Sequence, residues 1–204
     1  MVEAERATTI YVVRHGRTTL NAEGRFRGLA DPPLDEIGLA EADAVAAFIA
    51  ERPDAKRPLA AIATSRLVRA RQTAEAIGLA AGREPFVLDE LIDLDHGLWQ
   101  GLTPDEARAL DPEGYERFRQ DPRGATTPGG EALANAETRM RSALRTLSAR
   151  YPGEEMVAVS HEIPIRLLVS GVRGLDGPAV WEFELPTASV TTLVRKGDGG
   201  WTAV

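Results

Sequence analysis

The stretch Ile10-Tyr11-Val12-Val13-Arg14-His15-Gly16-Arg17-Thr18-Thr19-Leu20-Asn21 decides the fold of this 204-residue chain. Its first four residues are apolar and mostly β-branched or aromatic, which is typical of a buried strand. The strand should end where Arg14 and His15 begin, and Gly16 allows a sharp turn there. Ligands of open α/β sheets bind just beyond the carboxyl ends of strands, so His15 is a candidate for chemistry. A histidine after a strand is also commonly a surface or capping residue, and this stretch leaves both interpretations open.

A second apolar run ends in a histidine in the same way. Residues 156–159 are apolar, Ser160 and His161 follow them, and a helical pattern comes next. The chain has three histidines, and two of them end buried-strand patterns. This repetition favours a site in which both imidazoles take part.

Composition bounds the class of protein. The chain is 43% hydrophobic and 27% charged, which is ordinary for a soluble globular protein, so we expect one domain over residues 1–204. A net charge of −7 gives no electrostatic reason to bind nucleic acid or an anionic membrane. The absence of cysteine excludes thiol catalysis, disulfides and thiolate metal sites. Residues 1–9 lack the apolar core of a signal peptide and no apolar run is long enough to span a membrane, so we expect a cytoplasmic protein.

Strand and helix patterns alternate along the chain, which predicts an α/β fold with a mainly parallel sheet. Asp35 is placed as the N-cap of a helix that Pro53 and Pro58 end. Residues 102–128 contain four prolines and are expected to form an excursion over the surface, a lid that sets substrate specificity. The other expected elements are strands at 59–63 and 85–88, helices at 67–81, 131–151 and 165–172, and a terminal hairpin of 190–194 and 201–204 with its turn at 197–200.

Histidines at two strand ends, together with arginines and without metal-ligand spacing, point to phosphoryl chemistry rather than metal hydrolysis. A phosphate monoester is a dianion, so its cleavage needs fixed positive charge, an in-line nucleophile and an acid for the leaving oxygen. Neutral imidazole can be that nucleophile, and nearby arginines favour its neutral form. We therefore expect neither a metal nor a cofactor.

Five ordered motifs, at suitable spacings, carry a family resemblance. They are Arg14-His15-Gly16-x-Thr18-x-x-Asn21, then Gly24-Arg25-x-x-Gly28 with Asp31-x-Pro33-Leu34-x-Glu36-x-Gly38, then Ser65-x-Leu67-x-Arg69-Ala70-x-x-Thr73-Ala74, then Pro128-Gly129-Gly130-Glu131, and finally Val159-Ser160-His161. With them the chain resembles the histidine phosphatase superfamily, branch 1, also called phosphoglycerate mutase-like, over nearly its whole length. The resemblance implies a three-layer α/β/α sandwich around a mainly parallel sheet with an antiparallel edge.

The resemblance also implies catalytic roles. His15 would be the nucleophile and would pass through a phosphohistidine, while Arg14, Arg69 and His161 would clamp the phosphoryl oxygens. A helix arginine is ordinarily a surface residue, and the matched motif is what makes Arg69 a candidate. Asn21 would contact phosphate or substrate, although asparagine also suits turns.

The proton donor departs from the family pattern. The family places a glutamate four residues before the first glycine of a Gly-x-Trp-x-Gly segment, which residues 97–101 match. The donor position holds Asp93, whose side chain is one methylene shorter. Asp93 could still serve as the acid, with Glu90 and Asp95 as alternatives. His96 lies next to this site and is expected to shape the loop.

The residues expected to contact the substrate include further departures. The candidates for substrate binding are Thr18, Asn21, Arg27, Gly28 and Glu162. Arg17 replaces the usual Glu or Gln after Arg-His-Gly, and Arg27 stands where Gln is common, so both would add positive charge at the mouth. Glu162 stands where a glycine pair often begins and would add negative charge.

The leading hypothesis is a metal-independent phosphomonoesterase that acts on a small phosphorylated metabolite, with the oligomeric state left open. Its nearest rival is a cofactor-dependent phosphoglycerate mutase. The mutases of the family generally carry a longer insertion after the acid-bearing loop and a serine where Thr18 stands, so hydrolysis is favoured. A phospholigand-binding relative without turnover ranks third, because a binding module has no need for a complete set of two histidines and two arginines.

Overall fold

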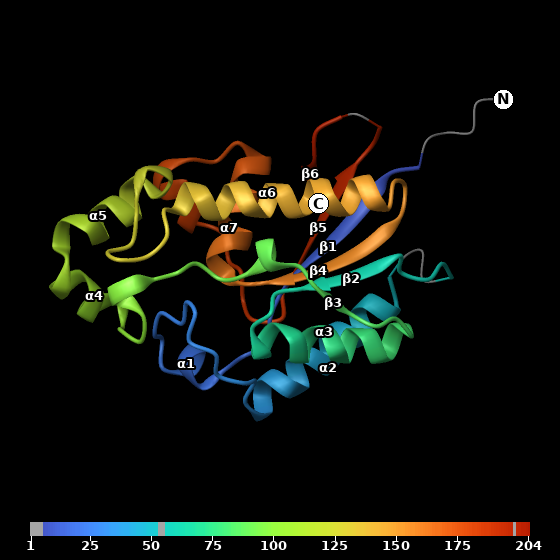
Figure 1. The fold of residues 1–204 in the computed structure, drawn as a ribbon, viewed down its shortest axis with the longest axis horizontal. Coiled ribbons are helices and arrows are strands. Elements are labelled where there is room, and N and C mark those ends of the chain that lie inside the picture. Colours follow the sequence, from blue (N-terminus) through green and yellow to red (C-terminus); the bar gives the residue numbers. More distant parts are fainter. Residues whose placement is uncertain (1–5, 53–55, 198) are drawn as a thin grey trace.

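The computed structural model describes residues 6–52, 56–197 and 199–204. In this described part, six strands form one sheet in the order β3-β2-β4-β1-β5-β6 (Figure 1). The strands are β1 Thr8–Arg14, β2 Ala61–Thr64, β3 Phe86–Val87, β4 Glu155–Ser160, β5 Val190–Arg195 and β6 Thr202–Ala203. The first four pair in parallel, whereas β5 and β6 are antiparallel at one edge.

Helices cover both faces of the sheet. They are α1 Thr19–Ala22, α2 Glu36–Ala50, α3 Val68–Ala81, α4 Pro104–Leu110, α5 Pro112–Gln120, α6 Leu133–Arg150 and α7 Glu162–Arg173. Figure 1 shows α2 and α3 on one face of the sheet and α6 and α7 on the other. Short 3₁₀ turns lie at Asp89–Leu91, Gly97–Trp99, Pro122–Gly124 and Gly177–Trp181. The expected three-layer α/β/α sandwich with a mainly parallel sheet and an antiparallel edge is confirmed.

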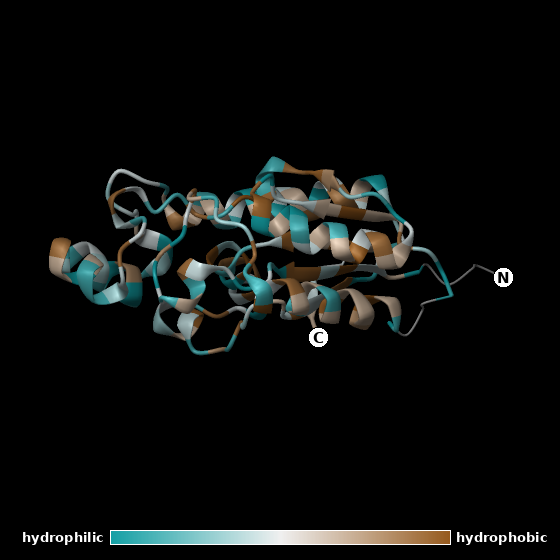
Figure 2. Cartoon of the chain, turned by 90° about the horizontal axis from the view of Figure 1, so that it is seen from below, coloured by the Kyte–Doolittle hydropathy of each residue, from teal (hydrophilic) through white to brown (hydrophobic). Residues whose placement is uncertain are grey.

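Strand β1 is buried on both faces, which explains its uninterrupted apolar run. Ile10 and Val12 pack into the cluster under α6 and α7. Tyr11 and Val13 point the other way, into the cluster under α2 and α3. Each side chain of this kind contributes about 1.5–3 kcal/mol on full burial, so the strand is firmly held between the two helical layers. The hydrophobic residues face the sheet along the helices in Figure 2.

Most element boundaries lie close to those expected. The Asp35 side chain caps α2 by accepting a hydrogen bond of 2.8 Å from the Gly38 amide. That helix ends at Ala50, and Pro53 lies outside the described residues. Helix α7 begins three residues before the expected start, at Glu162, because Pro164 is tolerated in the first turn of a helix.

Both ends of the chain bear on earlier expectations. The terminal hairpin forms as expected from β5 and β6, which pair antiparallel. Asp198 in its turn, and residues 1–5 of the segment assessed for a signal peptide, lie outside the described residues. In the described part of the chain, no helix combines the length and the apolarity that a bilayer span requires.

The proline-rich excursion folds as α4 and α5, at the end of the molecule beyond the sheet (Figure 1). Pro104 and Pro112 each open a helix at a position where the missing amide hydrogen costs nothing. Tyr115 and Phe118 of α5 are buried in a third apolar cluster, which also holds Trp99. The excursion is therefore packed through its own aromatic core, next to the carboxyl ends of β1 and β4. Its role as a lid stays a prediction.

Candidate active site

The carboxyl ends of β1 and β4 lie side by side and deliver the two histidines to one place. The strands pair in parallel, with Arg14 opposite Ser160. His15 and His161 follow directly, and their ring centroids are 5.0 Å apart with the ring planes at 56°. Both side chains are completely buried. Two imidazoles that are far apart in the sequence therefore share one enclosed space.

The hydrogen bonds of His15 define its tautomer. Its Nδ1 lies 2.6 Å from the carbonyl oxygen of Gly16, and a carbonyl oxygen only accepts, so Nδ1 carries the proton. Arg69 Nε lies 3.3 Å from His15 Nε2, and a guanidinium only donates, so Nε2 accepts. The imidazole is therefore neutral, with its lone pair on Nε2.

Electrostatics favour the same neutral form. Burial holds the pKa of His15 well below its usual value, and the guanidinium groups of Arg69, Arg27 and Arg14 lower it further. Burial also holds the pKa of His161 well below its usual value, with Arg69 as the next cause. At neutral pH both rings are uncharged, and Nε2 of His15 has the electron pair that a nucleophile needs.

Arg69 is a helix residue that is fully buried, because α3 begins at the carboxyl end of β2 and turns this side chain inward. Its Nη1 donates to the carbonyl of Ala30 at 2.7 Å, and its Nη2 donates to the carbonyl of Gly28 at 2.9 Å. Gly28 has a φ of 52°, a conformation that favours glycine. Gly28 thus positions Arg69 through its backbone, and its expected contact with substrate stays a prediction.

Asp93 completes the buried centre of the site. Its Oδ2 lies 2.9 Å from Arg69 Nη2 and 3.7 Å from His161 Nδ1, and its side chain is 3% exposed. Of the alternative acids, Asp95 accepts a hydrogen bond from the Gly97 amide and so caps the turn that follows. Glu90 and Asp95 do not line the cavity described below, whereas Asp93 does. The geometry therefore favours Asp93 among the three candidate acids.

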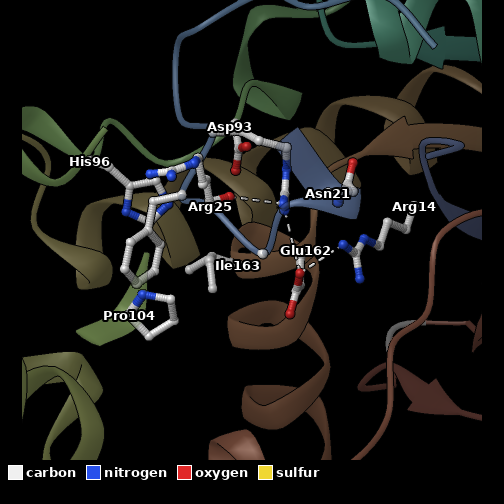
Figure 3. Close-up of a pocket in the computed structure, with 11 residues that line it drawn as sticks. Arg14, Asn21, Arg25, Asp93, His96, Pro104, Glu162 and Ile163 are labelled. Atoms are coloured by element: carbon white, nitrogen blue, oxygen red, sulfur yellow. Dashed lines mark hydrogen bonds and ion pairs between the residues drawn. The ribbon is translucent and has the colours of Figure 1, made fainter. Parts of the chain in front are cut away.

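Arg14 and Arg27 share one carboxylate. Arg14 Nη2 lies 2.8 Å from Glu162 Oε2, and Arg27 Nη2 lies 3.4 Å from the same oxygen (Figure 3). Arg14 Nη1 also donates to the carbonyl of Leu185. Burial lowers the pKa of Arg14 to about 10, with Glu162 opposing the shift, so this guanidinium stays protonated at neutral pH. Glu162 thus brings negative charge to the site, as its sequence position predicts.

Thr18 and Asn21 have a clear structural role. Thr18 is the N-cap of α1, and Asn21 Oδ1 accepts from its amide at 3.0 Å and from its hydroxyl at 2.8 Å. Because its oxygen is used in this cap, Asn21 can offer its amide nitrogen to the cavity, which it lines. Arg17, expected at the mouth, pairs instead with Asp35 at 2.9 Å and does not line the cavity.

A small cavity opens from this centre, with a volume of about 260 Å³. It is lined by Arg14, Asn21, Gly24, Arg25, Phe26, Arg27, Asp93, His96, Pro104, Glu162 and Ile163. Several buried nitrogens have no hydrogen-bond partner in the described part of the chain, namely Nε of Arg14, Nε of Arg27 and both ring nitrogens of His161. Unsatisfied buried donors are costly, so an anion with several oxygens suits this cavity.

Sequence reasoning missed Arg139, which holds the loop that carries Asp93. Arg139 Nη2 donates to the carbonyl of Asp93 at 3.0 Å, and Nη1 donates to the carbonyls of Glu90, at 2.9 Å, and Ile92. Glu131 fixes the guanidinium in turn, at 2.9 Å from its Nε. Glu131 belongs to a matched motif, but nothing in the sequence shows that its partner on α6 supports the acid loop.

A second support comes from Gly97, one turn after Asp93. Its φ is 51°, and a Cβ there would overlap the carbonyl oxygen of Pro128. The loop and the Pro128-Gly129 segment therefore pack backbone against backbone. His96, as expected, helps to shape this loop, since its buried ring lies 4.7 Å from that of Phe26.

In the part of the chain that the structure describes, no group of three or more His, Cys, Asp or Glu side chains is arranged to hold a metal ion. The cations of the site are guanidinium groups, which bind phosphate oxygens through directed N–H donors.

Comparison with known proteins places this geometry. The model of the histidine phosphatase superfamily (branch 1) matches residues 10–204. Phosphoserine phosphatase 1 of Hydrogenobacter thermophilus is 31% identical over 184 residues, which are 90% of this chain and 85% of that protein. A bifunctional protein of Mycobacterium tuberculosis is 32% identical over 94% of this chain, which spans only 51% of that relative. The structure of a mycobacterial glucosyl-3-phosphoglycerate phosphatase is 27% identical, with a TM-score of 0.83 and 97% of each chain covered.

Proposed function

We infer the function of this chain from its family, because it belongs to the histidine phosphatase superfamily, branch 1. Relatives named as phosphatases support phosphatase activity. We propose that the chain hydrolyses a phosphate monoester of a small metabolite through a phosphohistidine, without a metal ion. The observation that carries this proposal is the neutral, fully buried His15, whose Nε2 lone pair lies between Arg69 and His161.

In the first step, His15 Nε2 attacks the phosphorus and the bond from phosphorus to the leaving oxygen breaks. Arg14, Arg69 and His161 hold the phosphoryl oxygens, and their N–H groups are fixed before the reaction by burial. Asp93, protonated in the substrate complex, gives its proton to the leaving oxygen. In the second step Asp93 takes a proton from a water molecule, which attacks phosphorus and frees His15.

Buried guanidinium groups make a metal ion unnecessary for charge stabilisation. Arg69 is fully buried and Arg14 nearly so, and both point donors at the space between the histidines. In such a water-poor space, hydrogen bonds to the equatorial oxygens are stronger than in bulk water.

The test uses p-nitrophenyl phosphate in the presence of EDTA. We expect inorganic phosphate to be released, and we expect His15→Ala to reduce the rate by at least about 10³-fold, as loss of a nucleophile does. The wild type should form an acid-labile, alkali-stable phosphoenzyme from ³²P-labelled substrate, and His15→Ala should not. Circular dichroism of the variant controls for folding.

A parallel reaction with 3-phosphoglycerate and bisphosphoglycerate tests the mutase alternative. Isomerisation without phosphate release would assign the chain as a mutase. Loss of all activity on addition of EDTA, or a phosphoenzyme that persists in His15→Ala, would contradict the proposed mechanism.

A further inference from the structure

The cavity has a closed end and an open end, and the chemistry separates them. The closed end is formed by His15, His161 and Arg69, each of which is fully buried. The open end includes Glu162, whose side chain is 28% exposed. If the phosphoryl group occupies the closed end, as the proposed function requires, the leaving group must extend past Glu162 to reach solvent.

The arginines around the cavity already have carboxylate partners. Arg69 pairs with Asp93 at 2.9 Å. Arg14 and Arg27 share Oε2 of Glu162, at 2.8 and 3.4 Å. Arg25 is paired twice, to Glu23 at 3.0 Å and to Glu106 at 2.9 Å. A second anionic group on the substrate would therefore meet cations whose charge is already balanced.

Glu162 also keeps one oxygen for the ligand. Its Oε2 takes both of the contacts with Arg14 and Arg27, while Oε1 has a single long contact, 3.5 Å from Arg166 Nη2. An ammonium or hydroxyl hydrogen on the leaving group can satisfy Oε1, whereas a carboxylate cannot donate to it. Phe26, Pro104 and Ile163 line the same cavity and offer apolar contact to a short carbon chain (Figure 3).

We propose that Glu162 makes this chain selective for phosphomonoesters of amino alcohols and polyols and discriminates against leaving groups that bear a carboxylate. The inference rests on the proposed function for the position of the phosphoryl group. It sets this chain apart from a relative named for phosphoserine, whose leaving group carries both an ammonium and a carboxylate. The residue acts on specificity, and the reacting atoms stay with His15 and Asp93.

Two pairs of substrates isolate the carboxylate. Phosphoethanolamine and O-phosphoserine differ only by one carboxylate, as do glycerol 3-phosphate and 3-phosphoglycerate in place of a terminal hydroxymethyl group. In each pair, kcat/KM is measured for the wild type, for Glu162→Gln and for Glu75→Gln. Glu75 is exposed on α3 and does not line the cavity, so its variant controls for the net charge of the protein.

The wild type should prefer the member of each pair that lacks the carboxylate. Glu162→Gln should shift both ratios about tenfold toward the carboxylate, the effect of two like charges roughly 6 Å apart at an effective dielectric constant between those of protein and water. Glu75→Gln should leave both ratios unchanged. A shift of less than about twofold in Glu162→Gln, or an equal shift in Glu75→Gln, would overturn the inference.

The same ratios are measured by binding, through the rise in the unfolding temperature that each phosphate ester produces. This measurement separates the two proposals. No hydrolysis of any ester, p-nitrophenyl phosphate included, would refute the proposed function, while the binding ratios would still support or overturn the role of Glu162. Hydrolysis with ratios that are insensitive to Glu162 would overturn the specificity alone.

Discussion

Lowering the pH below about 6.5 should destabilise this protein through histidines that are buried without charge. Burial lowers the pKa of His96 from 6.5 to about 4. Between these two values the unfolded chain binds a proton at this residue and the folded chain does not. The contribution to the free energy of unfolding is therefore complete above about 6.5 and is lost as the pH falls toward 4.

The magnitude follows from the size of the shift. A displacement of one pKa unit corresponds to about 1.4 kcal/mol, so the change from 6.5 to about 4 corresponds to about 3 kcal/mol for His96. The structural reason is that Nδ1 of His96 has no partner in the described part of the chain and the ring packs against Phe26. His15 and His161 add losses of the same sign, because their pKa values are lowered in the same direction.

Urea unfolding of the wild type and of His96→Gln, from pH 8 to pH 5, isolates the contribution of His96. The absolute cost of the substitution is the same at each pH, and the losses from His15 and His161 are common to both proteins. The wild type should lose about 2 kcal/mol more than the variant between pH 7.5 and pH 5. Two parallel curves of free energy against pH would refute the assignment of a neutral, low-pKa His96.

Two further predictions concern the acid loop. Asp93→Asn should slow the hydrolysis of alkyl phosphates by about 10²–10⁴-fold and that of p-nitrophenyl phosphate far less, because a good leaving group needs no proton; equal slowing of both classes in steady-state assays would assign the acid elsewhere. Arg139→Met should lower the free energy of urea unfolding by about 2–4 kcal/mol, because the buried carbonyls of Glu90 and Asp93 lose a charged donor. It should also reduce kcat more than it raises KM, and a variant with unchanged kcat would show that Arg139 does not position Asp93.

The parts of the fold and site that the sequence predicts are local. The strand that ends at His15 and the N-cap at Asp35 each depend on residues within a few positions of one another. The second strand end, at His161, follows the same rule, and parallel pairing then brings the two histidines together. For this reason the α/β layers and the histidine pair could be predicted without coordinates.

Long-range pairings are what the sequence does not show. Glu162 is 148 residues from Arg14 in the chain, and nothing local indicates that its carboxylate lies 2.8 Å from that guanidinium. Arg139 looks like any other arginine on α6, although it holds three carbonyls of the acid loop. Arg17 was expected at the mouth and pairs with Asp35, because the polypeptide turns back at the start of α2.

The same opposition of burial and charge explains both the stability and the selectivity of the site. Guanidinium groups as buried as Arg14 and Arg69 would be strongly destabilising alone, and their carboxylate partners offset much of that cost. The pairing is incomplete, since Nε of Arg14 and both nitrogens of His161 have no partner in the described part of the chain. Each unmet buried group costs about 1–3 kcal/mol. A phosphoryl group can satisfy these groups, whereas a second anion cannot gain from cations that already have carboxylate partners.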